Sequence, residues 1–285
     1  MDSKTIVITG ASDGVGAEAA RQLHHHGHQV VIVGRSPRKT EAIGDELGVE
    51  RHVADFSRLA DIRRLASDLQ NAHPRIDVLA NNAGGIFGGP ARTEDGFEVT
   101  FQVNHLAPFL LTHLLLDTLT TSAASVIQTS SAGARLFGKV VLDDLEHDRD
   151  FSSQRAYGTA KLDNILFTQE LHRRFHGQGI SAAAFHPGTV ASGFASNSGD
   201  FVQRLYGSRV ARRLMTTPRK AAGQLVWLAE GRPGTDWLSG AYYEKRRPAR
   251  RTHPQTRDED IARRLWDRSE QLLSLPGELG RTADA

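Results

Sequence analysis

The chain contains no cysteine among its 285 residues, so disulfide bonds, thiolate metal sites and cysteine nucleophiles are excluded. It also lacks any run of about 18 apolar residues, the length that a membrane-spanning helix requires. The first apolar run, residues 6–8, is too short for the core of a signal peptide. These absences predict a cytoplasmic protein without a membrane span.

An excess of charge of one sign is missing as well, because 35 Lys and Arg face 33 Asp and Glu. Much of the arginine lies in the C-terminal third, where residues 245–247 and 250–251 form a basic cluster. Surfaces that bind single-stranded nucleic acid interleave such charges with aromatic side chains, and this cluster has none. We interpret it as solvated surface and expect no nucleic-acid partner.

A histidine tract at residues 24–28 has the composition of a metal site. It falls where a helix is expected to end, and Gly27 within it supplies the turn that ends helices. We therefore predict no metal site.

The sequence does contain a β-branched, apolar strand at residues 5–9, followed at once by a glycine-rich turn and a helical pattern. In this arrangement, backbone N–H groups and the N-terminus of the helix hold a pyrophosphate. Glycines give the turn its conformational freedom and let phosphates approach the backbone closely. The predicted nucleotide-binding loop consists of Gly10, Ser12, Asp13, Gly14, Val15 and Gly16.

The second predicted strand, residues 30–33, indicates which dinucleotide is bound. An acid just after this strand would bind a ribose 2′-hydroxyl, whereas an arginine would accept a 2′-phosphate. The chain has Arg35 there, with Arg38 and Lys39 close behind and no acid at the strand end. A solvated basic loop is the alternative, but the pattern favours NADP(H) over NAD(H).

Further strands are predicted at residues 51–55, 76–80, 126–129 and 181–185, with a last one near residues 240–243. Asp55 ends one of these strands and is expected to face an adenine. Small and amide residues at strand ends allow close approach to a nucleotide, although they also suit an ordinary turn. The residues that follow the other strand ends are Asn82, Ala83, Gly84, Ser130, Ser131, Pro187, Gly188, Thr189 and Val190.

A proline interrupts the long helical pattern of residues 94–119. Pro108 has no N–H, so the carbonyl oxygen of Asn104, four residues back, loses its helical partner. That leaves a polar group in need of water or a ligand at the point where the helix should kink. A structural kink alone would also explain the proline.

Tyr157 and Lys161 lie four residues apart in a segment that is expected to be helical, so their side chains share one face. A free phenol ionises near pH ~10 and is a poor proton donor or acceptor at neutral pH. A neighbouring ammonium favours the phenolate and lowers the tyrosine pKa toward the working range. The pair alone is a weak signal, since residues often share a helix face by chance.

Strands and helices alternate along the chain, with neither an internal repeat nor a linker. This predicts a single doubly wound α/β domain over residues 1–275, with a mostly parallel sheet of about seven strands. Residues 193–218 combine Gly, Ser and Asn with a short amphipathic piece, which fits a substrate lid or an ordinary loop. Residues 276–285 are expected to form a frayed tail.

Together these motifs resemble the short-chain dehydrogenase/reductase family, with a Rossmann-type fold, over residues 5–243. Residues 160–167 and the ending near residues 264–266 are similar to the retinol-dehydrogenase-like branch. Membrane-anchored members of that branch carry an N-terminal apolar segment, which this chain lacks. The motifs that occur in family order are Thr9 with the glycine loop, Asn81 to Gly84, Asn104, Ser131, Tyr157 with Lys161, and Pro187-Gly188.

The resemblance implies a catalytic role for four of these residues. Tyr157 would exchange a proton with the substrate oxygen, and Lys161 would lower the Tyr157 pKa and bind the nicotinamide ribose. Ser131, favoured by its position over Ser130, would orient the substrate carbonyl and stabilise charge on its oxygen. The carbonyl of Asn104 would hold a relay water.

The resemblance also implies how the cofactor and a second copy bind. Thr189 and Val190 would contact the nicotinamide carboxamide, and hydride would pass directly to the carbonyl carbon without a metal. Family members often pair through the helices that here begin near residues 94 and 157, so a homodimer or homotetramer is expected.

We therefore expect an NADP(H)-dependent carbonyl reductase or alcohol dehydrogenase with a small-molecule substrate. The segment 193–218 and the branch resemblance favour a bulky, apolar ketone or aldehyde, such as a polyketide-like metabolite or a retinoid-like aldehyde. One alternative is a non-catalytic NAD(P)-sensing or scaffold protein, which would have no need of Ser131, Tyr157 and Lys161. Another is a nucleotide-sugar epimerase or dehydratase, whose usual glycine spacing and larger C-terminal region are absent here.

Overall fold

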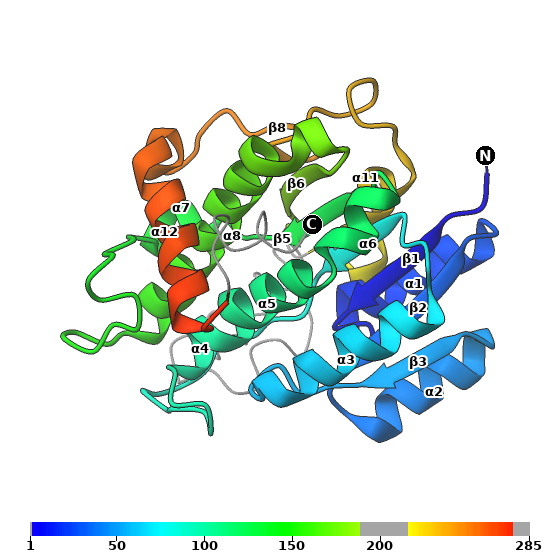
Figure 1. Cartoon of the computed structure of the whole chain (residues 1–285), viewed down its shortest axis with the longest axis horizontal. Coiled ribbons are helices and arrows are strands. Elements are labelled where there is room, and N and C mark those ends of the chain that lie inside the picture. Colours follow the sequence, from blue (N-terminus) through cyan, green and yellow to red (C-terminus); the bar gives the residue numbers. More distant parts are fainter. Residues whose placement is uncertain (1, 189–215, 276–285) are drawn as a thin grey trace.

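Short apolar segments rich in β-branched residues form one central sheet, which helices cover on both faces (Figure 1). The computed structural model describes residues 2–188 and 216–275. The predicted fold class is confirmed, and every predicted strand is present. The described strands are β1 (Thr5–Thr9), β2 (Gln29–Gly34), β3 (Glu50–Val53), β4 (Val78–Asn81), β5 (Ser125–Thr129), β6 (Ser181–His186), β7 (Ala241–Glu244) and the short, unpredicted β8 (Arg247–Pro248).

The strand order is β3-β2-β1-β4-β5-β6-β7-β8, and only the β7–β8 hairpin is antiparallel. The chain runs outward from β1 to β3 and then returns to β4, so the order reverses between β1 and β4. Ile8 lies opposite Ala80 at this point. Doubly wound sheets bind ligands beyond the carboxyl ends of the strands at such a reversal.

Helices pack on the sheet in two layers, because successive strand residues point to opposite faces. The described helices are α1 (Gly14–His25), α2 (Pro37–Leu47), α3 (Leu59–Ala72), α4 (Val99–Phe101), η1 (Gln102–Leu106), α5 (Ala107–Leu114), α6 (Leu116–Thr121), α7 (Gly133–Phe137), α8 (Ser153–Phe175), η2 (His176–Gln178), α11 (Pro218–Glu230), η4 (Pro254–Arg257) and α12 (Glu259–Leu272). Ile6 and Ile8 join a cluster with α1 and α11, whereas Val7 joins one with α3, α5 and α8. With both faces covered, the central strands are apolar throughout.

The long helix predicted from residues 94–119 begins only at Val99 and is divided into α4, η1, α5 and α6. The π-helical turn η1 is closed by a hydrogen bond from the Ala107 N–H to the Gln102 carbonyl. It lies directly before Pro108, whose missing N–H already removes one α-helical bond. The interruption predicted at this proline is real, and it takes the form of a π-helical turn that contains Asn104.

The C-terminal part of the domain follows the predicted order. Pro218, which we placed in the lid, instead begins α11, and the Thr217 side chain caps that helix. Thr216 and Thr217 of the predicted lid are described as well. The rest of the lid, residues 193–215, lies outside the described residues, and so does the predicted tail, residues 276–285. No helix among residues 2–188 and 216–275 is both long and apolar enough to cross a membrane.

The last helix, α12, packs against α8 and the α5 segment at the outer surface of the domain (Figure 1). Its Trp266 ring packs against Phe109 of α5 and Phe167 of α8, with ring centroids 4.8 and 5.5 Å away, and these two rings also contact each other. The apolar side of α12 thereby closes the core cluster on this side.

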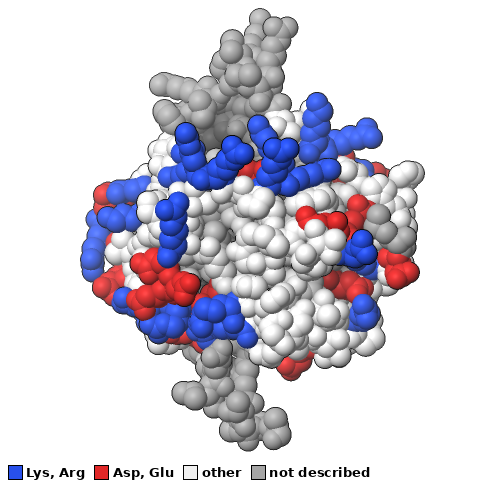
Figure 2. Space-filling model, turned by 90° about the horizontal axis from the view of Figure 1, so that it is seen from above, with Lys and Arg blue, Asp and Glu red and all other residues white. Residues whose placement is uncertain are grey.

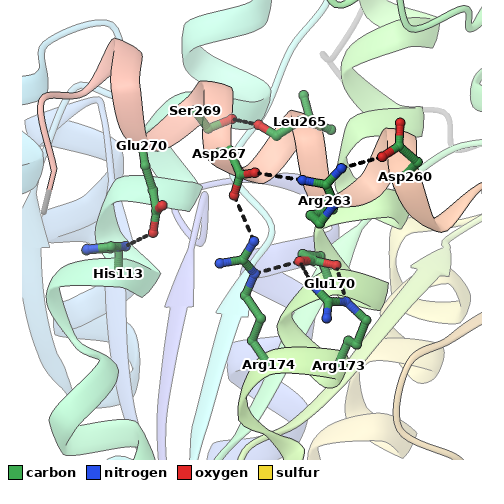
Figure 3. Close-up of polar contacts among 10 residues, drawn as sticks. All are labelled: His113, Glu170, Arg173, Arg174, Asp260, Arg263, Leu265, Asp267, Ser269 and Glu270. Atoms are coloured by element: carbon green, nitrogen blue, oxygen red, sulfur yellow. Dashed lines mark hydrogen bonds and ion pairs between the residues drawn. The ribbon is translucent and has the colours of Figure 1, made fainter. Parts of the chain in front are cut away.

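Ion pairs reinforce this contact, as Figure 3 shows. Arg174 of α8 binds the buried carboxylate of Glu170 at 2.5 Å and Asp267 of α12 at 2.8 Å, and its guanidinium lies 5.0 Å from the Trp266 ring.

We predicted that copies of the chain pair through the helices near residues 94 and 157. That pairing stays a prediction, and a partner on this side would meet α12 as well as α8.

Candidate active site

The carboxyl ends of β1, β4, β5 and β6 meet at one edge of the sheet, because these strands are parallel neighbours. Asn81 lies opposite Gln128, and Thr129 lies opposite Phe185. The segments that leave these strand ends carry the predicted site residues. The structure therefore brings the glycine loop, residues 82–84, Ser131 and residues 187–188 to one side of the domain.

The glycine loop holds its backbone tightly against the segment after β4. Gly10 and Gly14 have φ angles of 65° and 58°, which side-chain-bearing residues rarely adopt. A Cβ atom on Gly16 would lie 2.4 Å from the Gly10 carbonyl oxygen and 2.6 Å from Asn82 Nδ2. Glycine at these places keeps the first turn of α1 accessible to the close approach that a pyrophosphate needs. The loop thus fits a dinucleotide.

Predicted cations lie next to this loop at the end of β2. Asp13 caps α1 by accepting the Gly14 N–H at 2.7 Å, and its other carboxylate oxygen binds Lys39 Nζ at 2.6 Å. The hydrogen bond from Lys39 is the main cause that lowers the Asp13 pKa. Arg35 and Arg38 are exposed nearby in the chain. Lys39 is therefore held at the glycine loop by Asp13, a pairing that the sequence did not reveal.

The other predicted residues of the nucleotide side have structural contacts of their own. Ser12 packs beneath the end of β2, since a Cβ atom on Gly34 would lie 2.6 Å from that of Ser12. Val15 is half-buried against the core cluster. Asp55 accepts hydrogen bonds from the Ser57 N–H at 3.0 Å and from the Ser57 hydroxyl at 2.8 Å.

Asn82 ties the end of β4 to the glycine loop. Its amide donates to the carbonyls of Thr9 at 3.0 Å and Gly10 at 3.3 Å. The N–H groups of Asn82 and Ala83 both donate to the Thr9 hydroxyl at 3.0 Å. Thr9 is fully buried and was not among our predicted site residues, although its place directly before the loop was a signal.

The Tyr157–Lys161 pair lies on one face of α8, as the spacing predicts. Lys161 Nζ is 5.7 Å from the centre of the Tyr157 ring and donates to the Thr129 carbonyl at 3.1 Å. Burial lowers the Lys161 pKa to about 7. The lysine is almost inaccessible, while Tyr157 is half-buried. A phenol open to a ligand thus stands beside an amine whose pKa lies near neutrality.

Ser131, rather than Ser130, faces the space beside Tyr157. Ser130 is buried, and its hydroxyl donates to the Lys161 carbonyl at 2.7 Å. Ser131 is half-buried, and its hydroxyl accepts the Gly133 N–H at 3.1 Å. A Cβ atom on Gly133 would lie 3.4 Å from both Ser131 Oγ and a carbon of the Tyr157 ring. Gly133 therefore lies between the two predicted catalytic side chains.

Asn104 reaches the same centre from η1. A Cβ atom on Gly84 would lie 2.5 Å from Asn104 Oδ1 and 3.0 Å from Lys161 Nζ. The Asn104 amide donates to the carbonyls of Gly85 and Thr100, both at 2.9 Å, and its Oδ1 accepts the Gly85 N–H at 3.1 Å. The side chain is occupied by these backbone groups, which agrees with a role for the main-chain carbonyl.

Sequence reasoning missed Asn164 and the Thr129 carbonyl. Asn164 is buried one turn after Lys161 and donates to the same Thr129 oxygen at 3.2 Å. Its helical spacing from Lys161 was the available signal. Beyond β6, Gly188 has a φ of 94°, in agreement with a tight turn after Pro187. Two predicted contacts to the nicotinamide, Thr189 and Val190, lie outside the described residues.

No group of three or more metal-binding side chains occurs in the part of the chain that the structure describes. Two residues of the histidine tract, His26 and His28, instead contact Glu230 at 2.6 and 3.4 Å. The helix α1 ends within the tract, at His25, and Gly27, whose φ is 89°, follows its C-cap His26.

Known proteins share this arrangement. The sequence pattern of the family described as short chain dehydrogenase matches residues 4–202. Human retinol dehydrogenase 13 is 35% identical over 96% of this chain and 86% of its own length. A Streptomyces protein provisionally named daunorubicin C-13 ketoreductase DnrU is 37% identical over 94% of this chain and 92% of its own length.

Among solved structures, an uncharacterised protein of Mycobacterium paratuberculosis superimposes with a TM-score of 0.76 and is 32% identical. The match covers 95% of this chain and 94% of that one. Sequence and structure agree along nearly the whole length, and the relatives include proteins named for retinol oxidation and for ketone reduction. This chain belongs to the short-chain dehydrogenase/reductase family.

Proposed function

We propose that this protein is an NADP(H)-dependent reductase of ketones or aldehydes, in which Tyr157, Lys161, Ser131 and Asn104 are the catalytic residues. The observation that carries the proposal is the position of Gly84, flanked by Asn104 Oδ1 and Lys161 Nζ, while Gly133 lies between Ser131 and Tyr157. These two groups of residues meet where Lys161 Nζ lies 5.7 Å from the centre of the Tyr157 ring, and Gly84 follows Ala83, which packs against Gly10 of the glycine loop.

The side chains have distinct tasks in this proposal. A bound nicotinamide supplies the hydride that reduces the carbonyl carbon. Tyr157 gives its proton to the carbonyl oxygen and becomes a phenolate, and the neighbouring Lys161 ammonium stabilises that charge. Ser131 donates a hydrogen bond to the same oxygen as negative charge develops on it. The Lys161 ammonium, whose pKa is about 7, is suited to return a proton to the phenolate and become the neutral amine.

The cations at the end of β2 support NADP(H) as the cofactor. Arg35 and Arg38 are exposed there, and Lys39 is held against the glycine loop. The one carboxylate among these groups, Asp13, is matched by the Lys39 ammonium. A phosphate on the adenosine ribose would therefore meet a net positive site, whereas an unmodified ribose would find no free carboxylate to bind its hydroxyl.

Binding of NADPH and NADH to the wild type and to Arg35→Ala tests the cofactor. NADPH should bind more tightly, and Arg35→Ala should weaken NADPH by about tenfold to a hundredfold, because a charge-assisted bond contributes about 1.5–3 kcal/mol. NADH binding should hardly change. Arg75→Ala, which removes an exposed arginine just before β4 and so at the amino ends of the strands, away from the glycine loop, is the matched control. Equal binding of both cofactors would refute the phosphate site.

The substrate is proposed to be bulky and largely apolar, a polyketide-like or retinoid-like carbonyl compound. Support comes from the relatives, one named for retinol and another for a daunorubicin ketone. Rates of NADPH oxidation with a graded panel of carbonyls measure this preference. We expect kcat/KM to rise with apolar size, by roughly tenfold for a few buried methylenes. Faster turnover of small polar carbonyls would contradict the proposal.

A further inference from the structure

An exposed apolar surface borders the catalytic centre. Leu136, Phe137 and Val141 expose 57%, 44% and 36% of their surface. They lie on α7 and the segment that follows it, only a few residues after Ser131. The start of α8 packs closely on α7, since a Cβ atom on Gly158 would lie 2.8 Å from that of Phe137. Phe137 is therefore a close neighbour of the turn of α8 that carries Tyr157.

Exposed cations lie on the segments next to these side chains. The Gln255 side chain accepts the Val140 N–H and donates to the Val140 carbonyl, both at 2.9 Å, so the segment after β8 runs beside the segment after α7. Figure 2, which looks down on the side where β8 lies in Figure 1, shows Lys and Arg side chains in a row. The exposed cations of α7, of the β7–β8 hairpin and of the segments that follow them are Arg135, Lys139, Lys245, Arg247, Arg250 and Arg251. None of these six forms an ion pair with a described residue. Together with Leu136, Phe137 and Val141 we call them the basic–apolar patch.

The β7–β8 turn keeps a cation where a glycine would be less strained. Lys245 and Arg246 both have positive φ, 52° and 60°, as a two-residue hairpin turn requires. Such turns favour Asn-Gly because most side chains are strained there. Arg246 gains hydrogen bonds to Gly223 and Gln224 at 3.1 and 2.9 Å. The Lys245 side chain has no hydrogen bond within the described residues, so contacts inside the chain do not account for it.

Neighbouring acids offset only part of the charge of the patch, because Asp143, Asp144 and Glu244, which lies opposite Arg247, form no ion pair with a described residue but stand against six cations. Glu146 and Asp148 both pair with Arg92, at 3.0 and 2.6 Å, and Asp150 pairs with Arg155. A second copy of the chain is also a poor partner. Pairing through one patch about a two-fold axis would bring its cations against the same cations of the other copy. The patch requires an anionic partner that also accepts exposed apolar side chains.

We propose that the basic–apolar patch docks this protein on the surface of an anionic phospholipid bilayer. Basic side chains bind phosphate headgroups, and Leu136 and Phe137 enter the boundary between headgroups and acyl chains. An acidic protein partner would bind mainly through side chains inserted into a pocket of this surface. Two cavities of the described part of the chain, each of about 170 Å³, are lined by residues outside the patch. Docking would also turn the rim of the catalytic centre toward a lipid phase in which apolar carbonyl compounds dissolve.

Sedimentation of the full chain with phosphatidylcholine vesicles, with and without phosphatidylglycerol, tests the proposal. We expect binding only to the anionic vesicles. Arg250→Glu/Arg251→Glu should weaken it by about thirtyfold or more, since each cation near an anionic surface contributes about fivefold. Leu136→Ser/Phe137→Ser should weaken it by about tenfold. Circular dichroism and the thermal midpoint verify that both variants fold.

Arg64→Glu/Arg75→Glu is the matched control, because it makes the same change in charge at exposed positions outside the patch. No binding to anionic vesicles would overturn the proposal, and so would an equal loss in the control. Unchanged binding by Leu136→Ser/Phe137→Ser would also overturn it, since the patch would then recognise a polyanion such as nucleic acid or an acidic protein. The measurement needs no turnover, so its outcome is independent of the proposed reaction.

Discussion

Lys161 shows that single residues of the site work against stability. It is almost fully buried, and burial lowers its pKa to about 7. An unfolded lysine has a pKa of about 10.4, so between these values the unfolded chain binds more protons and the stability of the fold rises with pH. At neutral pH and below, the buried ammonium is therefore a cost. A residue kept at such a cost fits the chemical role proposed for it.

Asp163, two residues further along α8, is a buried carboxyl group to which the proposed mechanism assigns no chemical role. It therefore allows the effect of burial on stability to be tested separately. It is fully buried, both carboxylate oxygens lack a hydrogen-bond partner among the described residues, and burial raises its pKa well above the usual value. Since the folded-state pKa is raised, the stabilisation present near pH ~4 is lost as the pH rises through the folded pKa. Asp163→Asn removes this titration.

We expect Asp163→Asn to unfold at a higher temperature than the wild type at neutral pH, by about 2–4 °C for each unit of pKa shift, and to match it near pH ~4. Thermal unfolding over a pH series measures the difference. Asp68→Asn on α3, an exposed acid, should leave the curve unchanged. A variant that is less stable than the wild type at neutral pH would show that the carboxylate has a favourable partner.

Residues that act through local spacing could be predicted from the sequence, and residues that act through distant contacts could not. The four-residue spacing of Tyr157 and Lys161 is enough to place both side chains on one face. The choice of Ser131 over Ser130 rests on counting from the strand end, and their burial favours it. The Asp13–Lys39 pair joins the N-cap of α1 to the first turn of α2, and no local pattern encodes it.

At the scale of elements, the glycine loop and α1 depend on a close approach between backbones. A Cβ atom at residue 16 would lie 2.4 Å from the Gly10 carbonyl oxygen, which cannot move without reshaping the turn. Gly16→Ala should therefore weaken NADPH binding by about a hundredfold, since misplaced phosphate contacts each lose about 1.5–3 kcal/mol. Calorimetric titration measures the loss.

Gly177→Ala provides the matched control for the loop variant, because a Cβ atom there meets nothing within 4 Å. It should bind NADPH as the wild type does. If Gly16→Ala also kept its affinity, the loop would not be the pyrophosphate site, and the site would have to be sought elsewhere at this edge of the sheet.

For the helix that carries Asn104, the sequence predicts the position of the interruption but not its form. Pro108 predicts that the helix is interrupted, because a missing N–H can be read from the residue type. The form of the interruption, the π-helical turn η1, depends on neighbours far along the chain. The Asn104 amide binds the Gly85 carbonyl, and His105 contacts Ser269 of α12 at 2.9 Å. Such contacts follow from the packed fold and not from helical periodicity.

At the scale of the whole molecule, the alternation of strands and helices predicts the doubly wound sheet, since parallel strands need helical crossovers. The packing of α12 on α8 could not be predicted in the same way. Its amphipathic pattern shows that one side is buried, but only the fold places Trp266 against Phe109 and Phe167. The sequence alone likewise predicts that the basic cluster near residue 250 is solvated surface. Only the fold shows that the segment after β8 runs beside the segment after α7, next to exposed apolar side chains.

The central claim, that this molecule is a carbonyl reductase whose proton donor is Tyr157, is tested most directly by one comparison. NADPH oxidation with bulky carbonyl compounds, and NADPH binding, are measured for the wild type and for Tyr157→Phe, which removes only the phenol oxygen. We predict turnover by the wild type, a loss of about a thousandfold in the variant, and nearly equal binding in both. A wild type that binds NADPH but reduces no carbonyl, or a variant that keeps its turnover, would contradict the claim.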